Sequence, residues 1–498
     1  MKALIRWGGL GGSLLIAVAA YLGGSPFARG TTVTPGTLLA GKQGVLLPLC
    51  WIVGLTALSC AWWFGRRHIP STRWALVTAG LWLVPVLPML PLGSEDIYSY
   101  ACQGFVQQAG GDPYGGGVQA FGCPWLDSVS TTWRTSPAPY GPLFLLLAGG
   151  VVGLSDTLPG VIAGLRVIAL LGLAVLAAGL PVLARHSGRD AGRVVFTVLG
   201  CPLILIHLVS GAHNDALMVG LLVAGLALLA TARTPALGAS SRGSALAASA
   251  RGSALAASAR GSALAASSRT TVFLLVAAGA LLGLAVAVKA TAIVVLPFAV
   301  LAAVPPSSPL RALVRPAAWI GAGALGAVAV VSLLSGRGVG WVGGLLRSGD
   351  TVAWTSPSTA VGLVVELGAR LVGVPVAAVP VTRLLGILVL AVVLVWLWWR
   401  ARSGEALACA GLALAATVLC APVFHPWYAV WPLAVLAATR PESRLLLGLC
   451  AFAGTLTLPA GYNWALFTKI PGAVAVTAVL VVLATLAVRM RRTRKVTA

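Results

Sequence analysis

Residues 92–143 read LGSEDIYSYACQGFVQQAGGDPYGGGVQAFGCPWLDSVSTTWRTSPAPYGPL and form the longest polar interval between apolar runs, apart from one low-complexity segment. The interval holds four of the eleven acidic residues of the chain: Glu95, Asp96, Asp112 and Asp127. In a chain that is 58% hydrophobic and 9% charged, few other segments are polar enough to form an active site that is open to water. We therefore expect this interval to be an active-site loop.

A short helix is predicted at the start of this interval. Ser94 is placed as the N-cap, Glu95 and Asp96 fall in the first turn, and Gly110-Gly111 ends the helix. Each carboxylate in the first turn of a helix stabilises the helix by ~0.3–1 kcal/mol through its interaction with the helix dipole. Glu95 and Asp96 could therefore serve only to stabilise this helix. Their location beside an apolar run favours function, as do the ring types that stack on sugars and follow them: Tyr98, Tyr100, Tyr114, Trp125, Trp133 and Tyr140.

The composition excludes a soluble protein. The mean hydropathy is +0.96, and apolar runs long enough to cross a bilayer recur along the chain. The net charge of +23 does not require nucleic acid as a partner, because basic residues of membrane proteins collect in cytoplasmic loops. We predict one all-α polytopic membrane domain over residues 1–498, with the lipid bilayer as a partner.

About fourteen transmembrane helices are predicted, with both termini cytoplasmic. Their approximate ranges are 3–22, 45–64, 74–91, 160–184, 194–209, 216–232, 271–287, 290–304, 317–334, 380–399, 406–422, 428–439, 444–460 and 471–489. Arg66, Arg67 and Arg73 place the loop before the third span inside, which puts residues 92–143 outside. Two further apolar segments, 142–154 and 359–374, are expected to be interfacial on the outer side or, for 142–154, re-entrant.

The cysteines separate by position. Six of the eight lie within apolar runs, where a thiol acts as a small hydrophobic group. Cys102 and Cys123 lie in the polar interval, and on the oxidising side of a membrane they could form a disulfide. No metal-ligand spacing is evident, so no cofactor is expected, although a divalent metal stays open.

Residues 233–270 form a low-complexity insert that is predicted to be cytoplasmic and largely disordered. It contains RGSALAASA at 242–250 and again at 251–259, followed by RGSALAASS at 260–268. A nine-residue period is far below the 20–50 residues of a solenoid repeat. We therefore interpret the insert as a duplicated connecting segment.

Further candidates lie outside the polar interval. His213, Asn214 and Asp215 form a short outer turn that could cap the next helix or bind a ligand. Lys289 is either a snorkelling lysine at the interface or a contact for a lipid phosphate. His425 precedes a proline and could be a turn residue or a ligand contact. Two arginines of a later outer loop, Arg337 and Arg347, could be solvated or could contact phosphate.

Carboxylates and aromatic rings on an outer surface suit an enzyme that uses a lipid-linked sugar. A cation at headgroup depth would stabilise a phosphate leaving group, and a carboxylate would take the proton of an acceptor hydroxyl. The chain resembles the actinobacterial polyprenyl-phosphomannose-dependent α-(1→6)-mannosyltransferases of the GT-C fold. The resemblance rests on SEDIYSYACQG at 94–104, DPY at 112–114, APYGPL at 138–143, HND at 213–215, TSPST at 355–359 and FHPWY at 424–428.

The resemblance implies a polyprenyl-phosphate sugar donor, a growing mannan or glycolipid acceptor, and an acidic catalytic residue in the first large outer loop. Asp96 matches that acid, and Glu95 is the alternative. Contacts with the donor phosphate are assigned to Lys289, Arg337, Arg347 and His425. Contacts with sugar are assigned to Tyr98, Tyr100, Asp112, Tyr114, Tyr140, His213, Asn214, Asp215 and Trp427.

Two other classes compete with this hypothesis. A transporter or flippase would carry ionisable groups within its spans, as Arg166 and Arg383 do here. A non-catalytic membrane partner in envelope lipid or carotenoid biosynthesis could keep the fold without the activity.

Overall fold

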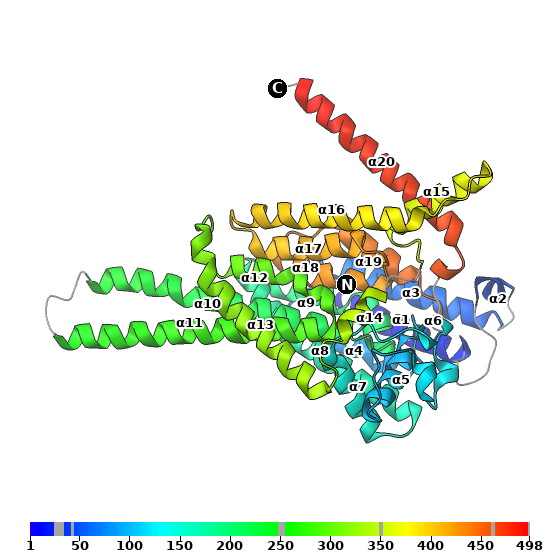
Figure 1. Ribbon diagram of the computed structural model, residues 1–498, viewed down its shortest axis with the longest axis horizontal. Coiled ribbons are helices and arrows are strands. Elements are labelled where there is room, and N and C mark those ends of the chain that lie inside the picture. The colour runs from blue at the N-terminus through cyan, green and yellow to red at the C-terminus, as the bar shows by residue number, and fades with distance from the viewer. Residues whose placement is uncertain (24–33, 41–43, 248–253, 348–351, 460–463, 497–498) are drawn as a thin grey trace.

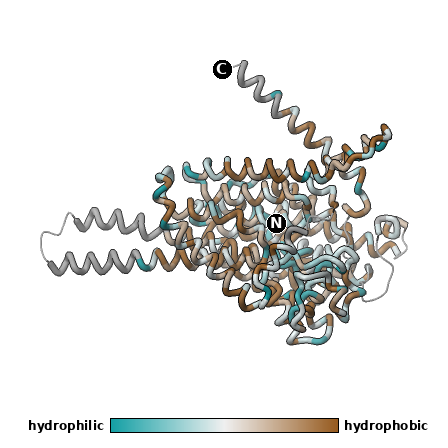
Figure 2. Tube along the Cα trace, viewed as in Figure 1, coloured by the Kyte–Doolittle hydropathy of each residue, from teal (hydrophilic) through white to brown (hydrophobic). Residues whose placement is uncertain are grey.

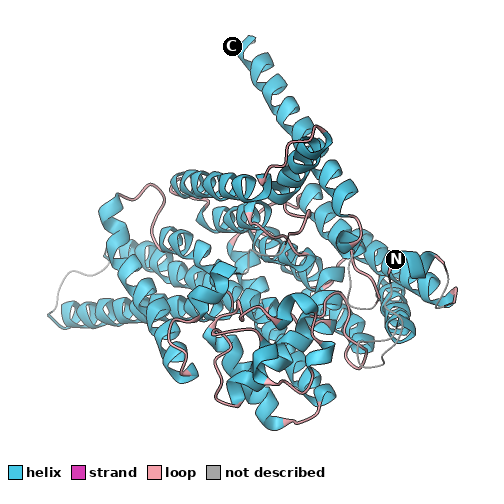
Figure 3. Ribbon diagram, turned by 45° about the vertical axis from the view of Figure 1, so that its right-hand side comes forward, coloured by secondary structure: helices cyan, strands magenta, loops and turns pink. Residues whose placement is uncertain are grey.

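The protein is built of helices. The structure, a computed structural model, describes residues 1–23, 34–40, 44–247, 254–347, 352–459 and 464–496, and these contain helices, turns and loops with no β-strand element (Figure 3). Apolar runs form helices in a bilayer because a helix satisfies its own backbone hydrogen bonds. The all-α prediction is confirmed.

The longer helices follow the apolar runs (Figure 1). They are α1 (Lys2–Gly23), α3 (Leu46–Gly65), α4 (Thr72–Leu83), α5 (Asp96–Gln108), α7 (Pro142–Leu154), α8 (Leu158–His186), α9 (Ala191–Leu199), α10 (Asp215–Ala247), α11 (Ala254–Val288), α13 (Val314–Ser335), α15 (Pro357–Leu371), α16 (Ala378–Ala401), α17 (Ala406–Cys420), α18 (Val430–Thr439), α19 (Arg444–Thr455) and α20 (Lys469–Val496). Short helices connect them: α2 (Pro35–Leu39), α6 (Thr131–Arg134), α12 (Leu296–Ala302), α14 (Trp341–Arg347) and 3-10 turns that include η2 (Val84–Val86), η6 (Ala290–Val295) and η9 (Pro426–Ala429).

The chain is a multi-pass membrane protein. By length and composition, the described residues contain eight helices that could cross a membrane, or nine if the bent pair at residues 191–210 is one span. Four shorter apolar helices cover 142–154, 290–302, 406–420 and 444–455. The other predicted spans are thus short or broken helices, and the total of fourteen stays a prediction.

Close helix packing builds the core. Neighbouring pairs include α1 with α3, α8 with α10, and α11 with both α10 and α13. Gly12 and Gly54 let α1 and α3 approach, since a Cβ at either glycine would meet the other glycine's carbonyl oxygen at 2.8–2.9 Å. Helices α16 and α20 lie at the outside with exposed apolar side chains, which suits contact with lipid (Figures 1 and 2).

A broken helix leads into the turn at residues 211–214. Helix α9 ends before Pro202, and the π-helix η5 (Ile204–Ser210) continues at an angle of 64°. Proline lacks the amide hydrogen that would extend the ladder, so the break is encoded locally. Ala212 follows with φ of 45°, a conformation that non-glycine residues seldom adopt. The turn 211–214 thereby reverses the chain into α10.

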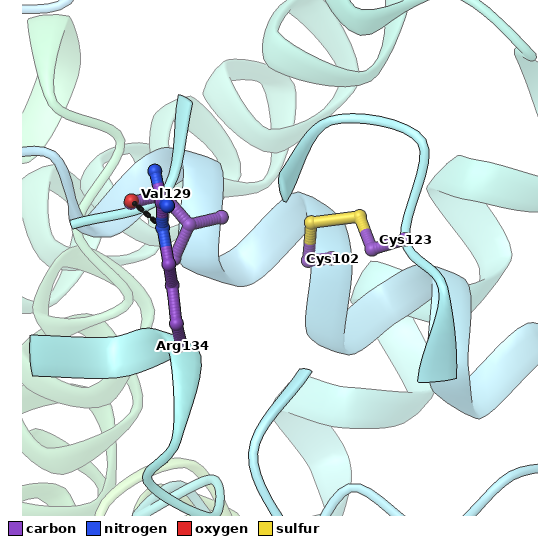
Figure 4. The surroundings of a disulfide bond; sticks show 4 residues. All are labelled: Cys102, Cys123, Val129 and Arg134. Atoms are coloured by element: carbon purple, nitrogen blue, oxygen red, sulfur yellow. Dashed lines mark hydrogen bonds between the residues drawn. A yellow bond between two sulfur atoms is a disulfide. The ribbon is translucent and has the colours of Figure 1, made fainter. Parts of the chain in front are cut away.

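Helix α5 organises the polar interval. It begins at Asp96, one residue later than predicted, because Glu95 rather than Ser94 occupies the N-cap position, while the Ser94 hydroxyl accepts the Asp96 N–H at 2.9 Å. Cys102 of α5 forms a disulfide with Cys123, as predicted (Figure 4). Further along the same loop, Arg134 donates to the Val129 carbonyl at 2.9 Å. The loop is thus tied to α5 and to itself.

The low-complexity insert differs from its prediction. Helix α10 runs into the repeats as far as Ala247, and α11 begins at Ala254. The described backbone there is helical rather than disordered, because alanine, leucine and arginine are strong helix formers. The pair extends beyond the ends of the other helices (Figure 1).

Candidate functional site

Five segments that are distant in sequence meet at one place. They are the start of α5, the short helix α6, the turn before α10 with the first residue of that helix, the residue that follows α11, and the turn η9 with the start of α18. The cluster that they form, called the carboxylate site below, contains Asp96, Trp133, Tyr100, His213, Asp215, Lys289, His425, Trp427, Tyr428 and Trp431. Figure 2 shows polar colouring gathered near α5 and α6, while the long helices are mostly apolar.

Asp96 is the accessible carboxylate of this site. Its Oδ1 accepts a hydrogen bond from Trp133 Nε1 at 3.0 Å, and its Oδ2 lies 3.8 Å from Nδ1 of His213. The same His213 nitrogen is 3.1 Å from the Tyr100 hydroxyl. The Asp96 side chain keeps 12% exposure, so one oxygen is oriented by tryptophan while the group stays reachable.

Asp215 is an enclosed carboxylate with a fixed partner. Lys289 Nζ lies 2.9 Å from each of its oxygens, and Trp431 Nε1 donates to Oδ1 at 2.6 Å. The Asp215 side chain has no exposed surface. Lys289 also lies over the rings of Tyr428 and Trp431, at 4.3 and 5.1 Å from their centroids. Lys289 is therefore paired with a buried carboxylate, and its own side chain is 11% exposed, close to the 12% of Asp96.

Imidazole rings stack on a tryptophan beside the carboxylates. His213 stacks on Trp427 at a centroid distance of 3.9 Å, and His425 stacks on the same indole at 4.6 Å. His207 of η5 lies 5.1 Å from Trp427. The indole thus aligns histidines, and its predicted contact with sugar stays a prediction.

Burial sets the protonation of these groups. Burial is the largest influence on Asp96 and raises its pKa to about 6, against the opposing effects of hydrogen bonds and the Lys289 charge. Burial also lowers the pKa of His425 to about 3 and that of His213 well below the usual histidine range. The site therefore presents neutral imidazoles beside a carboxylate that ionises near neutral pH.

The TSPST motif holds the loop that carries His425. Three of its hydroxyls donate to carbonyls of that loop: Thr355 to Phe424 at 2.6 Å, Ser356 to Ala421 at 2.6 Å and Thr359 to Pro422 at 2.8 Å. Arg383 of α16 donates in turn to the Thr359 hydroxyl at 3.0 Å. Hydroxyl-rich sequence at 355–359 thus serves to position the FHPWY segment.

The APYGPL motif joins the polar interval to the end of α11. Gly141 donates its N–H to the carbonyl of Val288 at 3.0 Å, and a Cβ on Gly141 would clash with the carbonyl of Ala287. Glycine is required for this approach. The contact places Tyr140 near Lys289, the residue that follows Val288, and the Tyr140 ring packs edge-on against that of Tyr100, which belongs to the carboxylate site.

Arg166 of α8 holds together the two turns that carry the carboxylates. Its guanidinium donates to the carbonyls of Leu87 at 2.6 Å, Met89 at 2.7 Å and Ser210 at 2.9 Å. The Ser210 hydroxyl also accepts the N–H of Leu92 at 2.9 Å. Arg166 has no carboxylate partner among the described residues, and the carbonyl groups that it binds supply partial negative charge instead.

Replacing Arg166 with leucine is expected to lower both the melting temperature and the activity. Three carbonyls would lose charged hydrogen bonds worth about 1.5–3 kcal/mol each, and the two turns would separate. Thermal unfolding in detergent and sugar transfer measure the two effects. Arg402→Leu is the control, because Arg402 donates to the single carbonyl of Ser308 outside the site. Equal losses in the two variants would contradict this role.

Some predicted site residues lie elsewhere. The Asp112 carboxylate accepts the N–H of Tyr114 at 3.0 Å, and the Tyr114 hydroxyl donates to the Tyr140 carbonyl at 2.9 Å, so both support the loop. Arg337 binds Gln107 at the far end of α5. Tyr98 is buried within electrostatic reach of Arg166, and the Asn214 side chain is buried next to His213. The side chain of Arg347 lies outside the described residues.

The sequence analysis assigned no site role to His207 or Trp431, and it named Arg166 only under the transporter hypothesis. A signal existed for each. Arg166 is a charge within an apolar run, His207 is one of only five histidines and lies six residues before His213, and Trp431 follows Trp427 by one helical turn.

Comparison with known proteins gives consistent results. Residues 6–305 match the model of the α-(1→6)-mannopyranosyltransferase family N-terminal domain, and residues 358–488 match the MptB C-terminal domain. The chain is 33% identical to α-(1→6)-mannopyranosyltransferase A of Mycobacterium tuberculosis, over 84% of this chain and 77% of that protein. It is 27% identical to α-(1→6)-mannopyranosyltransferase B of Corynebacterium glutamicum, over 92% and 75% of the two chains. No solved structure matches the chain.

Fold and site together define a polytopic helical membrane protein with an enclosed site of carboxylates, imidazoles and aromatic rings. The matches to both domain models and to these relatives identify the family of the protein. The chain belongs to the α-(1→6)-mannopyranosyltransferase family.

Proposed function

We propose that this protein is a membrane mannosyltransferase that moves mannose from a polyprenyl-phosphate donor to a growing α-(1→6)-mannan or lipoglycan acceptor on the outer face of the plasma membrane. Family membership supports the transfer of mannose. The observation that supports Asp96 as the base is its 12% exposure, whereas Asp215 is enclosed and paired with Lys289.

The reaction is a single displacement at the anomeric carbon. An acceptor hydroxyl gives its proton to Asp96, and its oxygen forms a bond to C1 of mannose. The bond between C1 and the phosphate oxygen breaks, and polyprenyl phosphate leaves with the electron pair. Attack from the opposite side converts a β-linked donor into an α-linked product. Trp133 orients the carboxylate throughout by its hydrogen bond to Oδ1.

Lys289 and His425 are the groups proposed for the leaving phosphate. Lys289 carries the positive charge, and its ammonium is held by Asp215 at 2.9 Å so that it needs little reorganisation as charge develops. His425 is only half-buried and stacks on Trp427, which fixes the ring. Both groups sit within the cluster that contains Asp96, and Lys289 acts electrostatically on both.

A transporter is the weaker alternative. Its sequence support was the pair of charges within predicted spans, Arg166 and Arg383. Arg166 is committed to three backbone carbonyls, and Arg383 donates to the Thr359 hydroxyl, so both have structural roles. The two arginines are therefore explained without a transport pathway through the protein.

Purified protein in detergent, given polyprenyl-phosphomannose and short α-mannosides, tests the proposal. Mannosyl transfer with formation of an α-(1→6) linkage is the expected result. Binding of the donor without transfer to any acceptor would contradict it and would favour a transporter or a non-catalytic partner.

The transfer rate is expected to fall as the pH drops below about 6. Because burial raises the Asp96 pKa to about 6, the carboxylate form that acts as base is lost on acidification. Between pH 7 and pH 5 the ionised fraction falls about tenfold, and kcat/KM should follow it. A rate that stayed constant down to pH 4.5 would exclude Asp96 as the base.

A further inference from the structure

One side of α5 carries a row of polar side chains, of which the reaction described above uses only Asp96. Asp96, Ser99, Gln103 and Gln107 are spaced by three, four and four residues. At 3.6 residues per turn these positions lie on one face of the helix. We call this row the α5 stripe. It runs along the helix from the proposed base.

The middle of the stripe is buried and lacks partners. Ser99 and Gln103 are each 1% exposed. Within the described part of the chain, the Ser99 hydroxyl and both polar atoms of the Gln103 amide have no hydrogen-bond partner. A buried polar atom without a partner costs about 1–3 kcal/mol, and such groups call for an explanation.

The two ends of the stripe are anchored. Asp96 at one end is held by Trp133. At the other end, Gln107 donates to the carbonyl of Ser335 at 2.9 Å and accepts from Arg337 Nε at 3.1 Å. Asp96 and Gln107 are eleven residues apart, which is about 16 Å along a helix. The stripe is thus a fixed polar row that begins at the base and ends beside an arginine.

We propose that the α5 stripe is the acceptor subsite, where Ser99 and Gln103 bind hydroxyls of the glycan chain behind its reacting end. The inference rests on the proposed function. A sugar hydroxyl both donates and accepts, and the Gln103 amide offers two N–H donors and a carbonyl acceptor. A row along a helix suits a linear polymer whose terminal hydroxyl must reach Asp96. Because Gln103 is 1% exposed, an acceptor that binds it must displace what packs against this face of α5.

Replacing Gln103 with methionine separates a binding role from a structural one. Methionine is close in length and volume but has no amide, so removal of an unpartnered polar group should leave the melting temperature unchanged or higher. The acceptor KM is expected to rise about tenfold for long α-mannosides, with donor KM unchanged. The shortest acceptor that supports transfer should be affected least, since it does not extend along the stripe.

Ser99→Ala is the second variant, and a smaller rise of about threefold in acceptor KM is expected. Ser59→Ala is the matched control, because the Ser59 hydroxyl is also buried without a partner in the described structure but lies on α3. An acceptor KM that stayed constant in both stripe variants would overturn the subsite and leave water as the partner of the amide. A wild-type protein without any transfer activity would instead refute the proposed function.

Thermal stabilisation of the protein by an acceptor tests the subsite without requiring mannosyl transfer. A long α-mannoside without donor should raise the melting temperature of the wild type more than that of Gln103→Met, since a ligand that binds the folded state stabilises it by mass action. Equal shifts in the two proteins would count against the subsite.

Discussion

Asp96→Asn is expected to fold normally and to lose roughly 10²–10⁴-fold in the rate of mannosyl transfer. The asparagine side chain keeps an oxygen that can accept the hydrogen bond from Trp133 Nε1, which is 3.0 Å long in the wild type. The local geometry should therefore persist. What it lacks is basicity toward the acceptor hydroxyl. Single-turnover transfer with saturating donor measures the chemical step, and donor binding should remain near the wild-type value.

Glu95→Gln is the matched control, because it removes the neighbouring carboxylate and should cost far less. Glu95 occupies the N-cap position and makes no capping hydrogen bond through its side chain. If Glu95→Gln lost activity while Asp96→Asn kept it, the base would move one residue back. If both variants were active, α5 would supply no base and Asp215 would be the next candidate.

Lys289→Met is expected to abolish most activity and to destabilise the protein. The substitution leaves Asp215 buried with Trp431 as its remaining partner, and an unpaired buried charge typically costs about 3–5 kcal/mol. Loss of the cation beside the leaving phosphate should lower the rate by roughly 10²–10³-fold. Thermal unfolding and transfer assays report the two losses separately.

The double variant Lys289→Met with Asp215→Leu tells the two effects apart. Replacing a buried ion pair by apolar side chains is often neutral for stability, so the melting temperature should recover. Activity should stay low, because no cation faces the phosphate. Recovery of near wild-type transfer in the double variant would show that Lys289 serves only to neutralise Asp215.

Local sequence predicted several features well. The long apolar runs indicated membrane helices, since a run of about 20 residues satisfies its own hydrogen bonds and needs no partner segment to do so. Gly110-Gly111 marked the end of α5, whereas the span predicted at 194–209 is broken at Pro202. Cys102 and Cys123 were predicted to pair because they lie within one loop, and the structure joins them at a Cα–Cα distance of 5.5 Å.

The site required information that no local pattern carries. Motif resemblance brought Asp96, His213 and His425 into one hypothesis, but it could not say which groups touch. Lys289 and Asp215 are 74 residues apart in the chain, and nothing in either segment shows that they form a pair. Arg337 and Asp96 both belong to predicted outer loops, yet Arg337 binds the opposite end of α5.

The amino-acid sequence by itself determined the helical class, the membrane setting, the polar interval and its disulfide, because each depends on residues close in the chain or on the overall composition. Only the tertiary structure decided which carboxylate is accessible, which lysine is paired and what Arg166 holds. The physical reason is that burial and pairing depend on the neighbours that packing brings from other helices. Asp96 and Asp215 are the same residue type, and they differ only in what surrounds them.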